Sequence, residues 1–142
     1  MRLHKIEIAK RQIDVAIDLL RTDGDYLAII TLAGAAEEIL GEFLKRHNKK
    51  AMVGHLEQLD VKLTGGRPYK VFNHEINGIR NALKHAKHQN EDEIKVEHSD
   101  AVAILSRAVA NYILLGEVES PKVLWFYNYL NRYCDKIDCN EM

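Results

Sequence analysis

The side chains best suited to chemistry share one face of a segment, Tyr69 to His88, whose apolar spacing predicts a helix. With about 100° of rotation per residue, one face of this helix carries six polar residues: His74, Asn77, Asn81, Lys84, His85 and His88. A solvated helix face normally carries Glu, Lys, Gln or Arg, because Asn and His are poorer helix formers. Arg80 lies at the border of this polar face and Lys87 extends its basic edge. An imidazole exchanges protons near neutral pH and a guanidinium binds two phosphate oxygens at once, so the face is suited to acid–base or phosphate chemistry.

Two simpler interpretations of this polar face stay open. It is an ordinary polar face on which histidines occur by chance, or His85 and His88, three residues apart, chelate a metal ion. The sequence lacks the HExxH pattern of helical zinc sites, so we assign no metal ligand and no cofactor.

The distribution of charge also bears on the partner. The chain holds 20 Lys and Arg against 21 Asp and Glu, which excludes the strongly basic composition of a protein that coats DNA. Residues 41–88 nevertheless hold ten Lys and Arg, four Asp and Glu and five of the seven histidines, a local surplus of six positive charges. This surplus is either an asymmetric solvated surface or a local site for an anion or a nucleic acid.

Length and composition predict one domain over residues 1–142, because a chain of this size has room for a single core. The longest apolar run, Ala108 to Leu115, is far shorter than the roughly 20 residues that span a bilayer, so we expect no membrane contact. The N-terminus carries charges where a secretory signal has its apolar segment, and we expect a cytosolic protein. Cys134 and Cys139 are too few for a disulfide framework or a four-cysteine zinc site, and we expect free thiols.

The apolar periodicity predicts an all-α fold, an antiparallel bundle of four to five helices with its core at about residues 5–115. Both prolines lie at the ends of periodic segments rather than inside them. The five long predicted helices are Leu3 to Thr22, one capped by Asp25 and ending near Arg46, Tyr69 to His88, one capped by Ser99 or Asp100 and ending before Gly116, and one opened by Ser120 and Pro121 at about 120–138. A further short helix is predicted from Met52 to Leu63.

The helix that follows Asp25 has an apolar stripe and a face of small residues opposite it. The stripe consists of Ile29, Leu32, Ala36, Leu40 and Phe43, and the opposite face of Thr31, Gly34, Glu38 and Gly41. Glycine inside a helix costs about 1 kcal/mol relative to alanine, so we expect a packing reason for Gly34. Glu38 is either solvated or pairs with Arg80 of the same or a second copy of the chain.

The last predicted helix concentrates the aromatic residues Trp125, Phe126, Tyr127, Tyr129 and Tyr133. Such rings can stack on nucleic-acid bases. Their helical spacing and the lack of an adjacent basic run favour packing in the core or at a subunit interface instead.

Residues 80–85, with the sequence RNALKH, resemble the signature of the HEPN superfamily: an Arg followed by a polar residue, with a His four positions further on, late in a long helix. Residues 25–40, which include the Ala-Ala-Glu-Glu sequence at 35–38, are similar to the second helix of such domains. The resemblance covers about residues 5–115. It implies a four- or five-helix bundle that dimerises, with the motif helices of two subunits around a shared cleft.

The resemblance further implies a metal-independent endoribonuclease. In such a site Arg80 would bind the scissile phosphate, His85 would be the general acid or base, and Asn81 would orient one of them. The substrate would contact Lys84, Asn77, His88, His74, Lys87 and Glu38. On an ideal helix Arg80 and His85 differ by about 140°, so two copies facing each other supply both groups to one cleft more easily than one copy does.

The resemblance leaves the biological role open. Some HEPN toxins carry a Tyr soon after the motif His, which their antitoxin modifies, whereas Ala86 and Lys87 follow here. A toxin or defence role with an antitoxin partner is therefore one outcome. Other members are non-catalytic modules that bind a nucleotide or a protein, and this is the alternative function.

Overall fold

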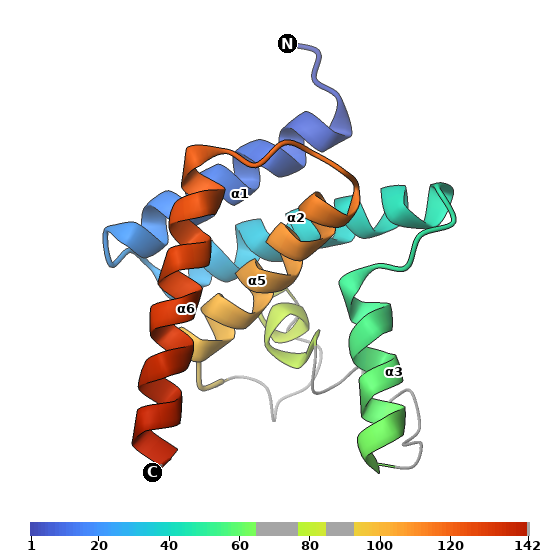
Figure 1. The fold of residues 1–142 in the computed structure, drawn as a ribbon. Coiled ribbons are helices and arrows are strands. Elements are labelled where there is room, and N and C mark those ends of the chain that lie inside the picture. Colours follow the sequence, from blue (N-terminus) through green and yellow to red (C-terminus); the bar gives the residue numbers. More distant parts are fainter. Residues whose placement is uncertain (65–76, 85–92, 142) are drawn as a thin grey trace.

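The computed structural model describes residues 1–64, 77–84 and 93–141, with side chains described for 1–58, 77–84 and 93–133. Within these ranges all regular structure is helical, which confirms the all-α class (Figure 1). The helices are α1 (Lys5–Arg21), α2 (Tyr26–Arg46), α3 (Met52–Thr64), α5 (His98–Leu114) and α6 (Pro121–Glu141). Between α3 and α5, the described residues 77–82 are also helical. None of the helices in the described ranges is long and apolar enough to cross a membrane.

Polar side chains set the starts of α1, α2 and α6. The predicted cap Asp25 is confirmed, because its Oδ1 accepts a hydrogen bond from Leu27 N at 2.8 Å. Ser120 Oγ accepts from Val123 N at 3.2 Å, which confirms the predicted start at Ser120 and Pro121. The first helix begins two residues later than predicted, because His4 is extended and its Nδ1 accepts the N–H of Ile6.

The prediction that Ser99 or Asp100 caps α5 is wrong. The cap is Glu97, whose side chain accepts from the backbone of Asp100, while Asp100 Oδ2 accepts from Glu97 N at 2.8 Å. Each carboxylate thus satisfies an N–H that the helix leaves open, and this reciprocal pair moves the helix start upstream of Ser99.

The long helix predicted over 69–88 is only partly observed. Residues 77–82 are helical and 83–84 form a turn, in which Lys84 N donates to Asn81 O at 3.1 Å. This bond spans three residues instead of four, so the helix tightens and ends there. The predicted apolar residues Ile79 and Leu83 pack at the edge of the core, and residues 65–76 and 85–92 lie outside the described residues.

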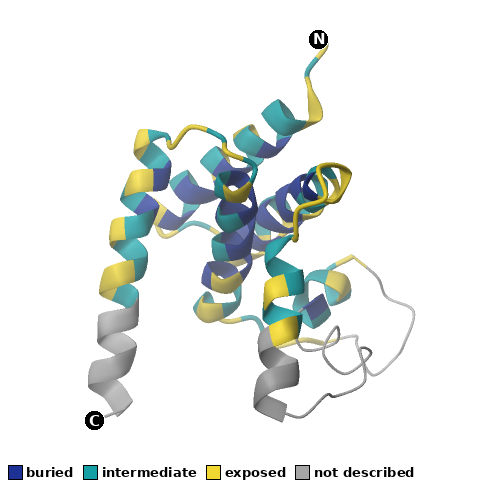
Figure 2. Ribbon diagram, turned by 45° about the vertical axis from the view of Figure 1, so that its right-hand side comes forward, coloured by how far each residue is buried: buried dark blue, intermediate teal, exposed yellow. Residues whose placement is uncertain are grey.

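The core lies where α2 packs against both α1 and α5. Figure 2 shows the buried residues, in dark blue, gathered on the sides of the helices that face each other. The fully buried side chains of the core include Ile13, Ile17, Ile29, Leu40 and Leu105. Helix α6 lies along one side of these helices (Figure 1) and buries Val123 and Phe126 against them. Lys122 Nζ bonds to Asp18 Oδ2 at 2.6 Å and joins α6 to α1.

One buried amide connects three helices. Asn111 on α5 is 1% exposed. Its Nδ2 donates to Glu37 O on α2 at 3.2 Å, and its Oδ1 accepts from Met52 N, the first residue of α3, at 2.7 Å. Asn111 thereby fixes where α3 starts relative to the core.

We expect Asn111→Ala to lower the free energy of unfolding by about 1–3 kcal/mol, because the Met52 N–H and the Glu37 carbonyl lose their partner. Urea denaturation measures this loss. Asn128→Ala, on the exposed side of α6, is the matched control and should change the free energy by less than about 0.5 kcal/mol. Equal effects of the two substitutions would contradict this role of Asn111.

Candidate functional site

The aliphatic part of the Arg80 side chain packs against Gly34 of α2. An added Cβ at Gly34 would lie 2.7 Å from Arg80 Cδ and 3.0 Å from Arg80 Cγ. Only glycine leaves room for the guanidinium stem at this point, which confirms the expected packing reason for Gly34. The Arg80 side chain is 15% exposed, so its stem is covered while its head remains at the edge of the protein.

A buried carboxylate on α2 faces two arginines. Glu37, one turn after Gly34, is 4% exposed, and its Oε2 accepts from Arg107 Nη2 on α5 at 3.1 Å. The same oxygen lies 3.9 Å from Arg80 Nη1, so Arg80 pairs with it electrostatically at more than hydrogen-bond distance. We call Glu37, Arg80 and Arg107 the charge cluster; it carries one surplus positive charge.

Asn77 belongs to the interior and not to a solvated face. It is 7% exposed, and its Oδ1 accepts from Arg107 Nη2 at 3.4 Å. The prediction that Asn77 lies opposite the core side of its helix is therefore wrong. The physical reason is that the segment 77–82 packs on a polar part of α2 and α5, where a buried amide can bind a buried cation.

Burial dominates the ionisation of the charge cluster. Burial raises the pKa of the Glu37 carboxyl above its ordinary value, and the positive charges of Arg107 and Arg80 oppose that shift. Burial also lowers the pKa of Arg107, while Glu37 acts against this. A buried carboxylate with two cationic partners costs much to desolvate, so it persists only where all three side chains stay together.

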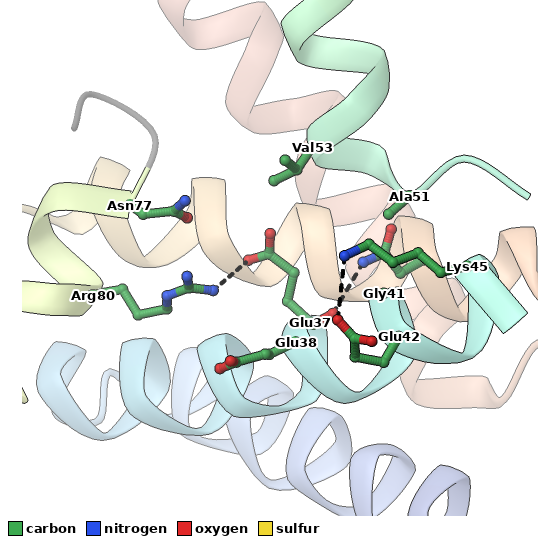
Figure 3. A pocket seen from close by; sticks show the side chains of 10 residues that line it. Glu37, Glu38, Gly41, Glu42, Lys45, Ala51, Val53, Asn77 and Arg80 are labelled. Carbon is green, nitrogen blue, oxygen red and sulfur yellow. Dashed lines mark hydrogen bonds and ion pairs between the residues drawn. The ribbon is translucent and has the colours of Figure 1, made fainter. Parts of the chain in front are cut away.

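A polar pocket of about 300 Å³ opens beside the charge cluster (Figure 3). Its lining is Glu37, Glu38, Gly41, Glu42, Lys45, Ala51, Val53, Asn77, Arg80 and Asn111. In Figure 3 the Arg80 side chain points from the 77–82 segment toward the Glu37 carboxylate at one end of the pocket. At the other end Lys45 Nζ bonds Glu42 Oε1 at 3.3 Å. The volume lies at the lower end of the range for small-ligand pockets.

The structure brings together only some of the predicted site residues. Asn81 and Lys84 are exposed on the same short segment as Arg80. Of the two alternatives for Glu38, the structure favours the solvated one: Glu38 is exposed and its Oε2 lies 3.8 Å from Lys84 Nζ. Within one copy of the chain Arg80 pairs with the neighbouring Glu37 instead. His74, His85, Lys87 and His88 lie outside the described residues.

Sequence reasoning missed Glu37, Arg107 and Asn111. The sequence does carry a signal for Glu37 and Arg107. Glu37 falls on the apolar stripe of α2, between Ala33 and Leu40, and Arg107 falls on that of α5. Opposite charges on the buried stripes of two helices predict a buried ion pair, since a lone buried charge is too costly.

Comparison with known protein families, with curated proteins and with solved structures found no match for this chain. Within the described part of the chain, no group of three or more His, Cys, Asp or Glu side chains is arranged to hold a metal ion.

Two glycines of α2 provide a matched test of the space reserved for Arg80. Gly34→Ala should lower the free energy of unfolding by about 1 kcal/mol, because displacement of the Arg80 stem outweighs the gain in helix propensity. Gly41→Ala should raise it by up to about 1 kcal/mol, since a Cβ there meets its nearest atoms at an ordinary 3.8 Å. Urea denaturation of both variants measures the difference. Equal stabilisation by both substitutions would show that Arg80 does not occupy the space at Gly34.

The raised pKa of Glu37 gives a second prediction. In carboxyl ¹³C NMR, Glu37 should titrate above its ordinary value of 4.5, whereas Glu97, whose pKa Lys95 lowers, should titrate below it. A folded-state pKa above the unfolded-state value means that Glu37 favours folding below about pH 4.5, and that this contribution is lost as the pH rises through the folded-state pKa. A Glu37 midpoint at or below that of Glu97 would contradict the dominance of burial.

Proposed function

We propose that this protein is a metal-independent endoribonuclease whose catalytic groups are Arg80 and His85, contributed by two copies of the chain to a shared cleft. The proposal combines the HEPN-like sequence at residues 80–85 with the geometry around Arg80. The observation that carries it is the environment of the Arg80 guanidinium. Its position is fixed by packing and by the charge of Glu37, but Glu37 lies beyond hydrogen-bond distance from it.

The Arg80 stem is fixed by the slot at Gly34 and its charge by Glu37. The closest approach of Arg80 to Glu37 is 3.9 Å, beyond hydrogen-bond distance. Among the described residues, Arg80 Nε has no hydrogen-bond partner. This Nε is buried, so the Nη groups of Arg80, which lines the pocket, are the donors that would meet the oxygens of a phosphate.

The surroundings of Arg80 favour an anion. Arg107 on α5 neutralises the negative charge of Glu37, so the positive charge of Arg80 is not cancelled by that carboxylate. Asn81 lies exposed on the same segment and supplies an amide, and Lys84 supplies a cation that Glu38 faces at 3.8 Å. A preorganised donor set of this kind stabilises charge that develops on a phosphate in the transition state.

In the proposed reaction the ribose 2′-oxygen forms a bond to the neighbouring phosphorus, and the bond from phosphorus to the 5′-oxygen of the next nucleotide breaks. One imidazole takes the proton of the 2′-hydroxyl, and a proton is delivered to the leaving 5′-oxygen. The products are a 2′,3′-cyclic phosphate and a free 5′-hydroxyl. Arg80 stabilises the phosphate charge throughout, and His85 performs the proton transfer.

A second candidate function is supported by the pocket. Its volume of about 300 Å³ and its polar lining next to Arg80 suit a nucleotide held without turnover. Three of its lining residues are glutamates, which disfavour a bare phosphate inside it and suit the amino groups of a base. A binding module predicts affinity that depends on Arg80 but no cleavage.

Cleavage of a mixed-sequence labelled RNA in EDTA tests the proposal. We expect Arg80→Ala to lower the rate by about 10²–10³-fold and His85→Ala by about 10²–10⁴-fold, at unchanged circular-dichroism helicity. Arg11→Ala, which removes an exposed cation of α1, is the control and should cleave normally. Absence of cleavage by the wild type, with Arg80-dependent nucleotide binding, would favour the binding module.

Mixing the two inactive variants tests the shared cleft. If Arg80 of one copy acts with His85 of the other, an Arg80→Ala and His85→Ala mixture contains heterodimers with one intact site and regains part of the activity. Each variant alone, at the same total protein concentration, is the control. Mixed dimers that form, as mass spectrometry under native conditions can show, but do not cleave would contradict a composite site.

A further inference from the structure

A ladder of aromatic rings runs along one side of α6. Trp125, Tyr129 and Tyr133 follow each other at four-residue intervals, and their rings are nearly parallel, with interplanar angles of 23° and 13° and centroid separations of 5.3 and 6.2 Å. All three are half-buried, whereas Val123 and Phe126 carry the buried face of the same helix. The ladder thus lies at the edge of the core, with part of each ring accessible.

A groove of about 470 Å³ lies beside Tyr129 and Tyr133 of this ladder. In this region α6 passes the first turn of α5 (Figure 1). The lining of the groove is His98, Tyr129, Arg132 and Tyr133. The His98 ring stands at 67° to that of Tyr129 and at 58° to that of Tyr133, so the rings form a corner and not a flat surface.

The corner is held in place before any ligand arrives. Tyr129 Oη lies 2.7 Å from His98 Nε2, and Tyr26 at the start of α2 contacts the His98 ring edge-on. His98 is the first residue of α5, so its backbone position is fixed by the reciprocal cap of that helix. Rings held in this way lose little conformational entropy on binding a ligand.

The charges beside the rings indicate the sign of the ligand. Arg132 is exposed at the groove and has no ion-pair partner among the described residues. Arg21 lies 5.3 Å above the Trp125 ring. Arg21 Nη1 also lies 3.9 Å from Asp18 Oδ1, so Arg21 is already paired with a carboxylate. Arg132 is therefore the cation at the groove, and it favours a ligand with a negative group. The aromatic corner requires in addition a flat ring, which a phosphate alone lacks.

We propose that this groove binds a nucleotide, with the base stacked against Tyr133 and Tyr129 and the phosphate next to Arg132. Stacking on aromatic side chains accepts any base because every base has a π-face, and an adjacent Arg adds phosphate contact. The site is separate from the charge cluster, since His98 and Arg107 are nine residues apart, about 14 Å along the axis of α5. It stands whether or not the chain cleaves RNA. The nucleotide is either free or part of a single strand.

Trp125 is the single tryptophan of the chain and lies in the ladder, so its fluorescence reports on the groove. We expect adenosine 5′-monophosphate to quench it saturably, and ribose 5-phosphate, which lacks the ring, to have no effect. Tyr133→Leu should weaken the binding by about 5- to 150-fold, the range that one base–aromatic stack contributes. Tyr133→Phe keeps the ring and should bind like the wild type. Arg132→Gln should weaken binding of the nucleotide but not of adenosine.

A 2′-O-methyl oligoadenylate, which cannot react through its 2′-oxygens, distinguishes the two sources. Tighter binding of the oligonucleotide than of the mononucleotide supports a single strand, and the reverse supports a free nucleotide. Failure of both ligands to quench at millimolar concentration overturns the proposal. So does equal quenching by ribose 5-phosphate, or an unchanged affinity in folded Tyr133→Leu. A dimer that buries the ladder would overturn it as well. In that case the rings would become less accessible to solvent as the protein concentration rises, and neither ligand would bind.

Discussion

The buried carboxylate of Glu37 is the constraint on which the rest of the site depends. Without partners, a charge that is 4% exposed would destabilise the fold strongly. Arg107 supplies a hydrogen-bonded partner from α5 and Arg80 a second positive charge from the 77–82 segment. The ion cluster therefore fixes how α2 and α5 face each other and where the 77–82 segment packs. Removing one partner costs more than the pair contributes, because the charge left behind stays buried.

The same constraint explains why the polar residues around Arg80 are not interchangeable with ordinary surface residues. Gly34 leaves the space for the arginine stem, Asn77 binds Arg107, and Asn111 binds the backbone of Glu37 while it fixes the start of α3. Each of these side chains satisfies a buried polar group, which is what a low-dielectric interior requires. A guanidinium held by such a framework needs little reorganisation to meet a phosphate.

Helix α5 connects the two regions to which we assign function. Its first residue, His98, forms the aromatic corner with α6, and Arg107, further along, belongs to the charge cluster. A helix fixes the separation of its residues, so the two regions keep a constant distance of about 14 Å along its axis. If both proposals hold, one region would bind a base by stacking while the other acts on a phosphate, and their spacing would select how a strand crosses the surface.

The elements of the fold could be predicted from the sequence. The apolar repeats of α1, α2 and α5, the cap at Asp25 and the Ser120–Pro121 start are local signals that the structure confirms. The cap of α5 was missed, because Ser99, Asp100 and Glu97 can all cap a helix and only the reciprocal pair of Glu97 and Asp100 decides among them. The end of the 77–82 helix was missed for a similar reason, since its residues are compatible with continuing the helix.

The sequence by itself determined the helical class, most helix starts and the need for a packing reason at Gly34, because these follow from spacing and from the local cost of glycine in a helix. Only the tertiary structure decided that Glu37 and not Glu38 faces Arg80, and that Arg107 lies 70 residues away on the other side of the same carboxylate. Neighbouring glutamates look alike in a sequence, but about 100° of helix rotation separates them, and that angle places one in the interior and the other in water.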